Sequence, residues 1–233
     1  MHSNCFLLIM LYLHFKLNYG KKKTFLLHII SRIISDFFNP LVSLVIYFVY
    51  FSIQNYTFKE AFTHFLPILL ITILPVIIWI VWNVKTGRYT NMDVSNRVQR
   101  KTLYIFIAVC IVSYLTFNYI KNGFIDFVML FILILLFALQ FSNLYIKSSM
   151  HTAFNVLVSA LFFAFDVKIG FAWLGIAILV GITRIILKRH TVKEVFMGAG
   201  IAVLVSFIYL YCNNKYQRND LPTEVIPVET TIK

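Results

Sequence analysis

The sequence predicts an all-α fold, a polytopic transmembrane helical bundle of about six or seven spans, from its composition and from the lengths of its apolar runs. Of the 233 residues, 60% are hydrophobic and only 13% are charged, whereas soluble domains are roughly 45–50% apolar and about a quarter charged. So few polar residues would not cover the surface of a soluble core. The apolar runs approach the roughly 20 residues that a helix needs to cross a bilayer.

Seven apolar runs define the expected spans. In chain order they are 37–54, 62–83, 103–120, 124–146, 150–166, 170–187 and 192–212. The short break at 121–123 makes a helical hairpin of the third and fourth runs, and Pro67 and Pro75 are expected to kink the second run. We therefore expect a transmembrane domain over 37–212. It follows an apolar and basic segment over 1–36, either interfacial or an additional span, and precedes a flexible tail over 213–233.

The formal charge of +12 lies between the apolar runs. Membrane orientation and anionic headgroups explain this placement better than nucleic acid does, and no nucleic-acid partner is expected. With seven spans, the basic junctions 84–102, 146–149 and 184–193 fall on one side, and the excess of Lys and Arg predicts that this side is cytoplasmic. No metal-binding spacing and no Walker-type loop appears, so neither a metal nor a nucleotide site is expected.

Two polar clusters on this side contain groups suited to binding an anion. Arg97 and Arg100 are three residues apart, so on a helix they share a face and could hold a phosphate, although a basic loop is the simpler reading. Lys147, Ser149 and His151 lead into the fifth run, where Ser148 or Ser149 would cap a helix whose free N–H groups attract anions. A capped helix with an interfacial histidine remains the alternative.

The third cluster lies in "TRIILKRHTVKE", residues 183–194. His190 and Glu194 are one helical turn apart, and a carboxylate at that spacing fixes the tautomer of an imidazole and raises its basicity. Arg184 lies upstream at the end of the sixth run. A basic loop with a helical salt bridge is the alternative here. Taken together, two imidazoles, a carboxylate and several cations at one membrane face fit phosphoryl transfer, in which cations neutralise the phosphoryl oxygens.

These residues resemble signatures of the type-2 phosphatidic acid phosphatase superfamily, the lipid phosphatase and vanadium haloperoxidase-like proteins. "TR-x5-H-x3-E", from Thr183 to Glu194, is similar to the third signature, SR-x5-H-x3-D. "SSMH", 148–151, is similar to the second signature, PSGH, and keeps Ser149 and His151. The sequence looks like a divergent bacterial branch of this superfamily, which implies the bacterial inner membrane as its location.

The first signature, K-x6-RP, departs most from the family pattern. Asp93 stands where the family has Lys, Arg100 is retained, and Lys101 replaces the Pro. Lys147 in "KSSMH" is a candidate for the missing cation. This departure motivates the alternative that the chain is a catalytically degenerate relative that binds anionic lipid headgroups without turnover. A small-solute transporter is less favoured, because no charged residue lies mid-span and no inverted repeat is evident.

The resemblance implies a role for each candidate residue. His190 would be the nucleophile that forms a phosphohistidine, Glu194 would orient it, and His151 would protonate the leaving group. Phosphate would be bound by Arg184, Ser149, Arg100, Arg97 and Lys147. The family needs no metal or other cofactor. The expected activity is hydrolysis of a phosphatidate-type lipid or an isoprenyl diphosphate, with membrane lipids as the partners and an unknown oligomeric state.

Overall fold

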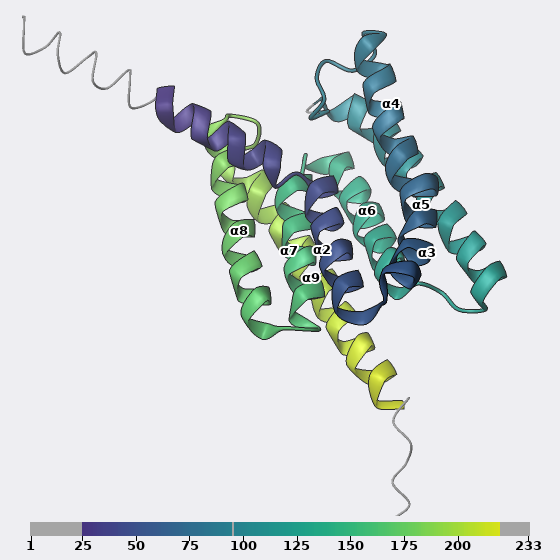
Figure 1. Cartoon of the computed structure of the whole chain (residues 1–233). Helices are drawn as coiled ribbons and strands as arrows, with labels where there is room; N and C mark the ends of the chain where they lie inside the picture. Colours follow the sequence, from purple (N-terminus) through teal and green to yellow (C-terminus); the bar gives the residue numbers. More distant parts are fainter. Residues whose placement is uncertain (1–24, 95, 220–233) are drawn as a thin grey trace, which may run out of the picture.

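The computed structural model describes residues 25–94 and 96–219, and this part of the chain is helical, as predicted (Figure 1). The expectations for the N-terminal 1–24 and for 220–233 lie outside the described residues. The helices are Phe25–Phe37, α2 (Pro40–Asn55), α3 (Phe58–Ile68), the π-helical turn η1 (Leu69–Ile73), α4 (Leu74–Lys85), α5 (Arg97–Asn122), α6 (Phe127–Tyr145), α7 (Met150–Phe163), α8 (Val167–Ile186) and α9 (Val192–Asn219).

The number of candidate spans agrees with the lower end of the six or seven expected, and the fifth expected run is the one that differs. Among residues 25–94 and 96–219, five continuous helical segments are long and apolar enough to cross a membrane, and there are six spans if Phe25–Phe37 and α2, which meet at a bend of 52°, count as one. The window 150–166 instead forms α7, which has 14 residues. At 1.5 Å per residue α7 is about 21 Å long, shorter than a hydrocarbon core of about 30 Å.

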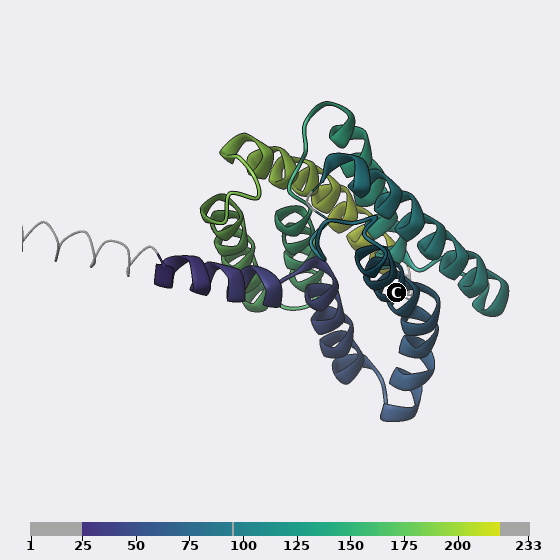
Figure 2. The ribbon, with the colours of Figure 1, turned by 90° about the horizontal axis from the view of Figure 1, so that it is seen from above.

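Helix α7 lies at the centre of the bundle. Every residue from 152 to 162 is buried, as expected for a helix that is apolar all round. It packs against α8, α9 and α2, which surround it in two perpendicular views (Figures 1 and 2). Because α7 begins at Met150, its N-terminus carries the residues of the second predicted cluster into the interior of the protein.

The second predicted span runs continuously from Phe58 to Lys85. Pro67 lies inside α3 and Pro75 in the first turn of α4, and the π turn η1 lies between them. A proline removes a backbone donor from the helix, and an inserted π turn is one way to accommodate such an interruption. The expected kink therefore takes the form of a change in helical register between the two prolines.

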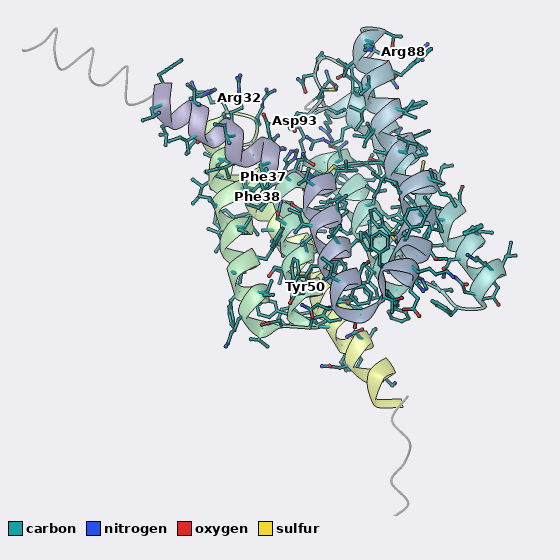
Figure 3. The ribbon with its side chains drawn as sticks, viewed as in Figure 1. Arg32, Phe37, Phe38, Tyr50, Arg88 and Asp93 are labelled. Atoms are coloured by element: carbon teal, nitrogen blue, oxygen red, sulfur yellow. The ribbon has the colours of Figure 1, made fainter. Side chains whose placement is uncertain are left out.

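The connection between α4 and α5 is folded back onto the helices it joins. The Tyr89 hydroxyl accepts a hydrogen bond from Trp79 Nε1 at 3.0 Å and lies 2.9 Å from Thr102 Oγ1. The Gln99 amide donates to the Arg88 carbonyl at 2.9 Å. In Figure 3 Asp93 of this connection lies near the end of the helix Phe25–Phe37, at the opposite end of the bundle from Tyr50. The connection therefore covers one end of the bundle.

Candidate active site

The three polar clusters that the sequence singles out meet at this end of the bundle. The Arg100 guanidinium donates to the Ser148 carbonyl at 2.9 Å, which joins the first cluster to the second. The Ser149 amide donates to the Glu194 carbonyl at 3.0 Å, and Lys147 Nζ donates to the Arg189 carbonyl at 3.1 Å, which join the second cluster to the third. Segments 40 to 50 residues apart in the sequence thus form one site.

His190 and Glu194 form the predicted imidazole–carboxylate pair. Nδ1 of His190 lies 2.9 Å from Oε2 of Glu194, and the same oxygen accepts the Thr191 amide at 3.1 Å. Thr191 in turn accepts the Glu194 amide at 3.3 Å, so the pair is built into a capping box at the start of α9. The other ring nitrogen, Nε2, is buried and has no hydrogen-bond partner among the described residues.

Arg184 is the most deeply buried cation of the site, with 1% of its surface exposed. One terminal nitrogen donates to the Ser35 hydroxyl at 2.8 Å, and the other donates to the Asp93 carboxylate at 2.5 Å. The backbone at the end of α8 fixes the position of Arg184. Lys188 takes a left-handed conformation at φ +54°, and the amides of Arg189 and His190 both return to the Arg184 carbonyl.

Asp93 bridges two of the predicted site residues. Its second carboxylate oxygen, Oδ1, lies 3.2 Å from Nε2 of His151, and Arg189 Nε lies 4.0 Å from Oδ2. The residue that departs from the family pattern is therefore at the centre of the site, in direct contact with its arginine and one of its histidines. The sequence places Asp93 near the phosphate pocket only through the spacing to Arg100, and no local pattern indicates its contacts.

A cavity of about 940 Å³ opens beside these groups. Near the ion pairs described above it is lined by charged and histidine side chains, namely His28, Arg32, Asp36, Asp93, Arg100, His151, Arg184, Lys188 and Arg189. The rest of the lining is mainly apolar and comes mostly from α2, α3, η1, α4, α5, α6 and α7, for example Leu44, Phe48, Val76 and Ile111. The cavity thus joins a charged end to a hydrophobic interior. His190 is not part of its lining.

Four of the predicted phosphate ligands have identified partners within the protein. Ser149 caps α7 and lies 3.0 Å from the Thr152 hydroxyl. Arg97 donates to the carbonyls of Asn143 and Leu144 at the end of α6. Arg100 lines the cavity, whereas Ser149, Arg97 and Lys147 do not. The phosphate-binding role thus stays a prediction for all four, and Arg100 is the one placed at the cavity.

Sequence reasoning missed Ser35, whose hydroxyl is fully buried against Arg184. The signal was present in "SRIIS", 31–35, because Ser31 and Ser35 are one turn apart on an apolar helix and both are buried. Two small polar residues on one face of such a helix indicate a packed face with polar contacts. The helix Phe25–Phe37 therefore belongs to the site.

Burial and neighbouring charge set the protonation of the site. Burial lowers the pKa of His190 from 6.5 to about 2, reinforced by the cations Arg100, Arg184 and Lys147, so its imidazole is neutral at neutral pH. Burial also lowers the pKa of Lys147, although Glu194 opposes the shift. Burial alone would raise the pKa of Asp93, but His151, Arg184 and Arg189 hold it below its ordinary 3.8.

Within residues 25–94 and 96–219, no group of three or more His, Cys, Asp or Glu side chains is arranged to hold a metal ion. The acidic and histidine residues of the site are instead joined in two pairs, Asp93 with His151 and Glu194 with His190. Cations, which would repel a metal, surround both pairs. The electrostatic character of this site is that of an anion-binding site.

Comparison with protein families agrees with this geometry. Residues 141–218 match the model of the PAP2 superfamily. This segment, about a third of the chain, is similar to the PAP2 superfamily. The match spans the second and third signatures, and so includes both histidines, Arg184 and Glu194, while Asp93 and Arg100 lie outside it. No curated protein and no solved structure matches the chain.

The similarity of residues 141–218 to the PAP2 superfamily suggests phosphatase activity on phosphate esters. The matched segment contains the His190–Glu194 pair and Arg184, whose side chains have the chemistry that attack and charge stabilisation in phosphoryl transfer require. The unmatched helices Phe25–Phe37, α2, α3, α4 and most of α5 supply most of the apolar cavity wall. The matched segment also contributes to the lining, through residues such as His151, Phe154 and Arg184.

Proposed function

We propose that the protein is an integral membrane phosphatase that hydrolyses a phosphate monoester or diphosphate of a lipid through a phosphohistidine at His190. The observation that carries the proposal is the state of this imidazole. Its Nδ1 is bonded to Glu194, its Nε2 has no hydrogen-bond partner among the described residues, and its pKa is lowered to about 2. A neutral imidazole with a free lone pair on Nε2 is a nucleophile.

The reaction balances with the residues of this site. Nε2 of His190 attacks phosphorus, the bond from phosphorus to the leaving oxygen breaks, and that oxygen takes a proton from His151. Burial and then Arg184 lower the pKa of His151 to about 3 when no substrate is bound, so the negative charge of the bound phosphate must raise this pKa for His151 to carry the proton. Water then attacks the phosphohistidine while neutral His151 accepts its proton, which releases inorganic phosphate and restores both imidazoles. Glu194 holds the Nδ1 proton of His190 and stabilises the positive charge that the ring acquires.

Cations supply the charge stabilisation. Arg184 and Arg100 both line the polar end of the cavity, and Arg184 Nε is buried without a hydrogen-bond partner among the described residues. Guanidinium groups bind phosphate through paired N–H donors, which makes Arg184 the principal ligand of the phosphoryl oxygens. Such donors fixed in a buried site stabilise the transferring group more strongly than donors in water do.

The cavity supports a lipid as the substrate. Its polar end holds the charged residues and its volume extends among the apolar side chains of α2, η1, α4 and α5. A phosphorylated amphiphile would place its headgroup at Arg184 and its hydrocarbon chain in this interior, where apolar surface is removed from water. Both a phosphatidate-type lipid and an isoprenyl diphosphate have this division between anionic head and apolar chain.

The positions of Lys and Arg support a cytoplasmic site in a bacterial inner membrane. The basic junctions around the site carry most of the Lys and Arg of the short loops, and cytoplasmic loops are enriched in these residues. Membrane lipids would then surround the helices, and the substrate would enter from the inner leaflet. Labelling of single cysteines placed in the junctions 84–102 and 121–123, in intact cells, tests this orientation.

A panel of lipid phosphates tests the function. Phosphate release from phosphatidate, lysophosphatidate and isoprenyl diphosphates is measured in detergent micelles with and without EDTA, for the wild type, His190→Ala and His64→Ala. His64 lies at the other end of the chain's helical bundle, stacked on Tyr56, and is the matched control. The proposal expects EDTA-insensitive release by the wild type and His64→Ala and none by His190→Ala. Equal rates for all three would refute it.

A lipid-binding protein without turnover is the second candidate. The observation that favours it is the contact between Asp93 and Arg184, together with the absence of His190 from the cavity lining. A protein of this kind would bind the lipid phosphates of the same panel and release no phosphate from any of them. Binding is measured in the same micelles by quenching of tryptophan fluorescence with brominated lipid analogues.

A further inference from the structure

We propose that Asp93 is an internal competitor for the substrate phosphate, whose carboxylate occupies the anion subsite until substrate displaces it. The inference rests on the phosphate-binding role proposed for Arg184. It assigns to Asp93 control over the affinity of the site for anions. It also explains why the site has a carboxylate at position 93, where the family signature has a lysine that could bind phosphate.

The contacts of Asp93 are those that a bound phosphate would make. One carboxylate oxygen lies 2.5 Å from Arg184 Nη2, and the other lies 3.2 Å from Nε2 of His151. In the proposed reaction Arg184 binds a phosphoryl oxygen and His151 faces the leaving oxygen. The carboxylate therefore spans the two groups between which the scissile bond would lie. An anionic substrate cannot take both contacts while Asp93 holds them.

The nucleophile is separated from the cavity in this arrangement. His190 does not line the cavity, although Arg184 and Asp93 do. Its Nε2 is buried, and its backbone amide donates to the carbonyl of Arg184 at 3.3 Å, so His190 is held next to the arginine that Asp93 contacts. Displacement of Asp93 from Arg184 would free the subsite in front of the nucleophile. Occupation of the subsite by Asp93 thus explains why the imidazole of His190 is buried, although it must contact the substrate during the reaction.

The backbone beside Asp93 is held in a strained conformation. Val94 has φ +44°, a left-handed region that a β-branched residue avoids, and its side chain is buried. Its carbonyl is 3.4 Å from Arg100 Nε, so the loop is tied to a second arginine of the site. Such strain persists only where surrounding contacts enforce it, and it is typical of segments with two arrangements. Loss of the Asp93 contacts would allow the loop to relax.

An internal competitor has a quantitative signature. The apparent dissociation constant of every anion equals its intrinsic value divided by the fraction of protein in which the subsite is free. Removing the competitor therefore lowers the constant by the same factor for anions of different charge. A carboxylate that merely repels ligand from nearby gives a different result, because that repulsion grows with the charge of the ligand.

The first experiment measures binding by isothermal titration calorimetry in detergent, with inorganic phosphate and with methylene diphosphonate, at one ionic strength. The variant is Asp93→Asn, and Asp36→Asn is the control, since Asp36 is an exposed carboxylate on the margin of the same cavity. We expect Asp93→Asn to tighten both ligands by a common factor of about ten or more, and Asp36→Asn to change them less than twofold. Two results would overturn the inference. One is unchanged or weaker binding of the anions by Asp93→Asn, and the other is an increase in affinity that is clearly larger for the diphosphonate than for phosphate.

A second measurement uses the unaltered protein, so it does not depend on the folding of the variant. Hydrogen–deuterium exchange is followed in peptides covering 86–94, where the Val94 amide is bonded to the Asn91 carbonyl and the Tyr89 amide to the Asn83 carbonyl. Saturating methylene diphosphonate should speed exchange in this segment, whereas bound ligand usually protects the amides of its site. Slower or unchanged exchange would contradict displacement.

These outcomes are separate from those of the proposed function. Tighter and equal binding by Asp93→Asn supports the competitor even if no lipid phosphate is hydrolysed. Hydrolysis that depends on His190, together with unchanged anion binding by Asp93→Asn, retains the phosphatase and removes the competitor. Both measurements report binding and need no turnover.

Discussion

Nδ1 of His190 lies 2.9 Å from Oε2 of Glu194, and the two residues are one helical turn apart at the start of α9. The carboxylate also accepts the Thr191 amide at 3.1 Å, so its position is fixed by the helix start. Glu194 therefore both caps the start of α9 and orients the imidazole of His190. A carboxylate in this position selects the tautomer that keeps the lone pair on Nε2.

Glu194→Gln is expected to lower kcat while leaving the fold intact. The amide oxygen of Gln can still accept the Thr191 amide, but the side chain no longer carries the charge that stabilises the imidazolium. The expected loss in kcat is about 10²- to 10⁴-fold, with little change in KM. Steady-state kinetics on the best lipid phosphate of the panel measure it.

The matched control is Glu60→Gln, because Glu60 forms an equivalent capping box with Thr57 at the start of α3. This variant should retain the kcat of the wild type. A similar loss in both variants would mean that capping, and not the orientation of His190, explains the effect.

Gly198→Ala should destabilise the contact between α9 and the start of α7. A Cβ at this position would lie 2.6 Å from the carbonyl oxygen of Ser149 and 3.0 Å from its amide nitrogen, and neither backbone atom can move without α7. We expect a cost of about 1–3 kcal/mol, and a fall in Tm of about 5 °C in detergent. Gly200→Ala is the control, since nothing lies within 4 Å of its added Cβ. Equal Tm values for the two variants would argue against this close packing.

The lowered pKa of His190 predicts a pH dependence of stability. The unfolded imidazole titrates near 6.5 and the folded one near 2, so below pH 6.5 the unfolded state binds the extra proton. Stability from this group is complete above pH 6.5 and falls by up to about 1.4 kcal/mol for each pH unit below it. The Tm of the wild type should therefore fall between pH 7 and pH 5. The Tm of His190→Gln should fall less steeply over this range than the Tm of the wild type. A wild-type Tm independent of pH would contradict the burial of a neutral His190.

Substitution of Arg97 distinguishes a residue that binds phosphate from one that stabilises the fold. Its guanidinium donates to the Asn143 and Leu144 carbonyls at the end of α6. Arg97→Ala is therefore expected to reduce stability by about 0.5–1.5 kcal/mol and to leave KM unchanged. Lys101→Ala, four residues along the same helix and exposed, is the control. A raised KM with an unaltered Tm would instead place Arg97 among the phosphate ligands.

Local patterns predicted the parts of the site that are local in the sequence. The His190–Glu194 pair follows from a spacing of four residues on a helix, and the Ser149 cap follows from a Ser before an apolar run. The meeting of the three basic junctions followed from the alternation of spans. Each of these features depends on short-range geometry or on membrane topology.

Contacts distant in the sequence could not be predicted in this way. Ser35 and Arg184 are 149 positions apart, and Asp93 and Arg184 are 91 apart. The short length of α7 was also missed, because an apolar run gives the same signal whether it spans the bilayer or lies at the centre of the bundle. In both cases tertiary packing decides what the local pattern leaves open.

Trapping of the phosphoenzyme tests the central claim most directly. The wild type is mixed for milliseconds with a lipid phosphate labelled with ³²P, quenched in alkaline detergent and digested, and the labelled peptide is identified by mass spectrometry. The account predicts label on His190, stable to alkali and lost in acid, with more label in His151→Ala if that variant slows hydrolysis of the intermediate. Phosphate release by the wild type without label on His190 would contradict it.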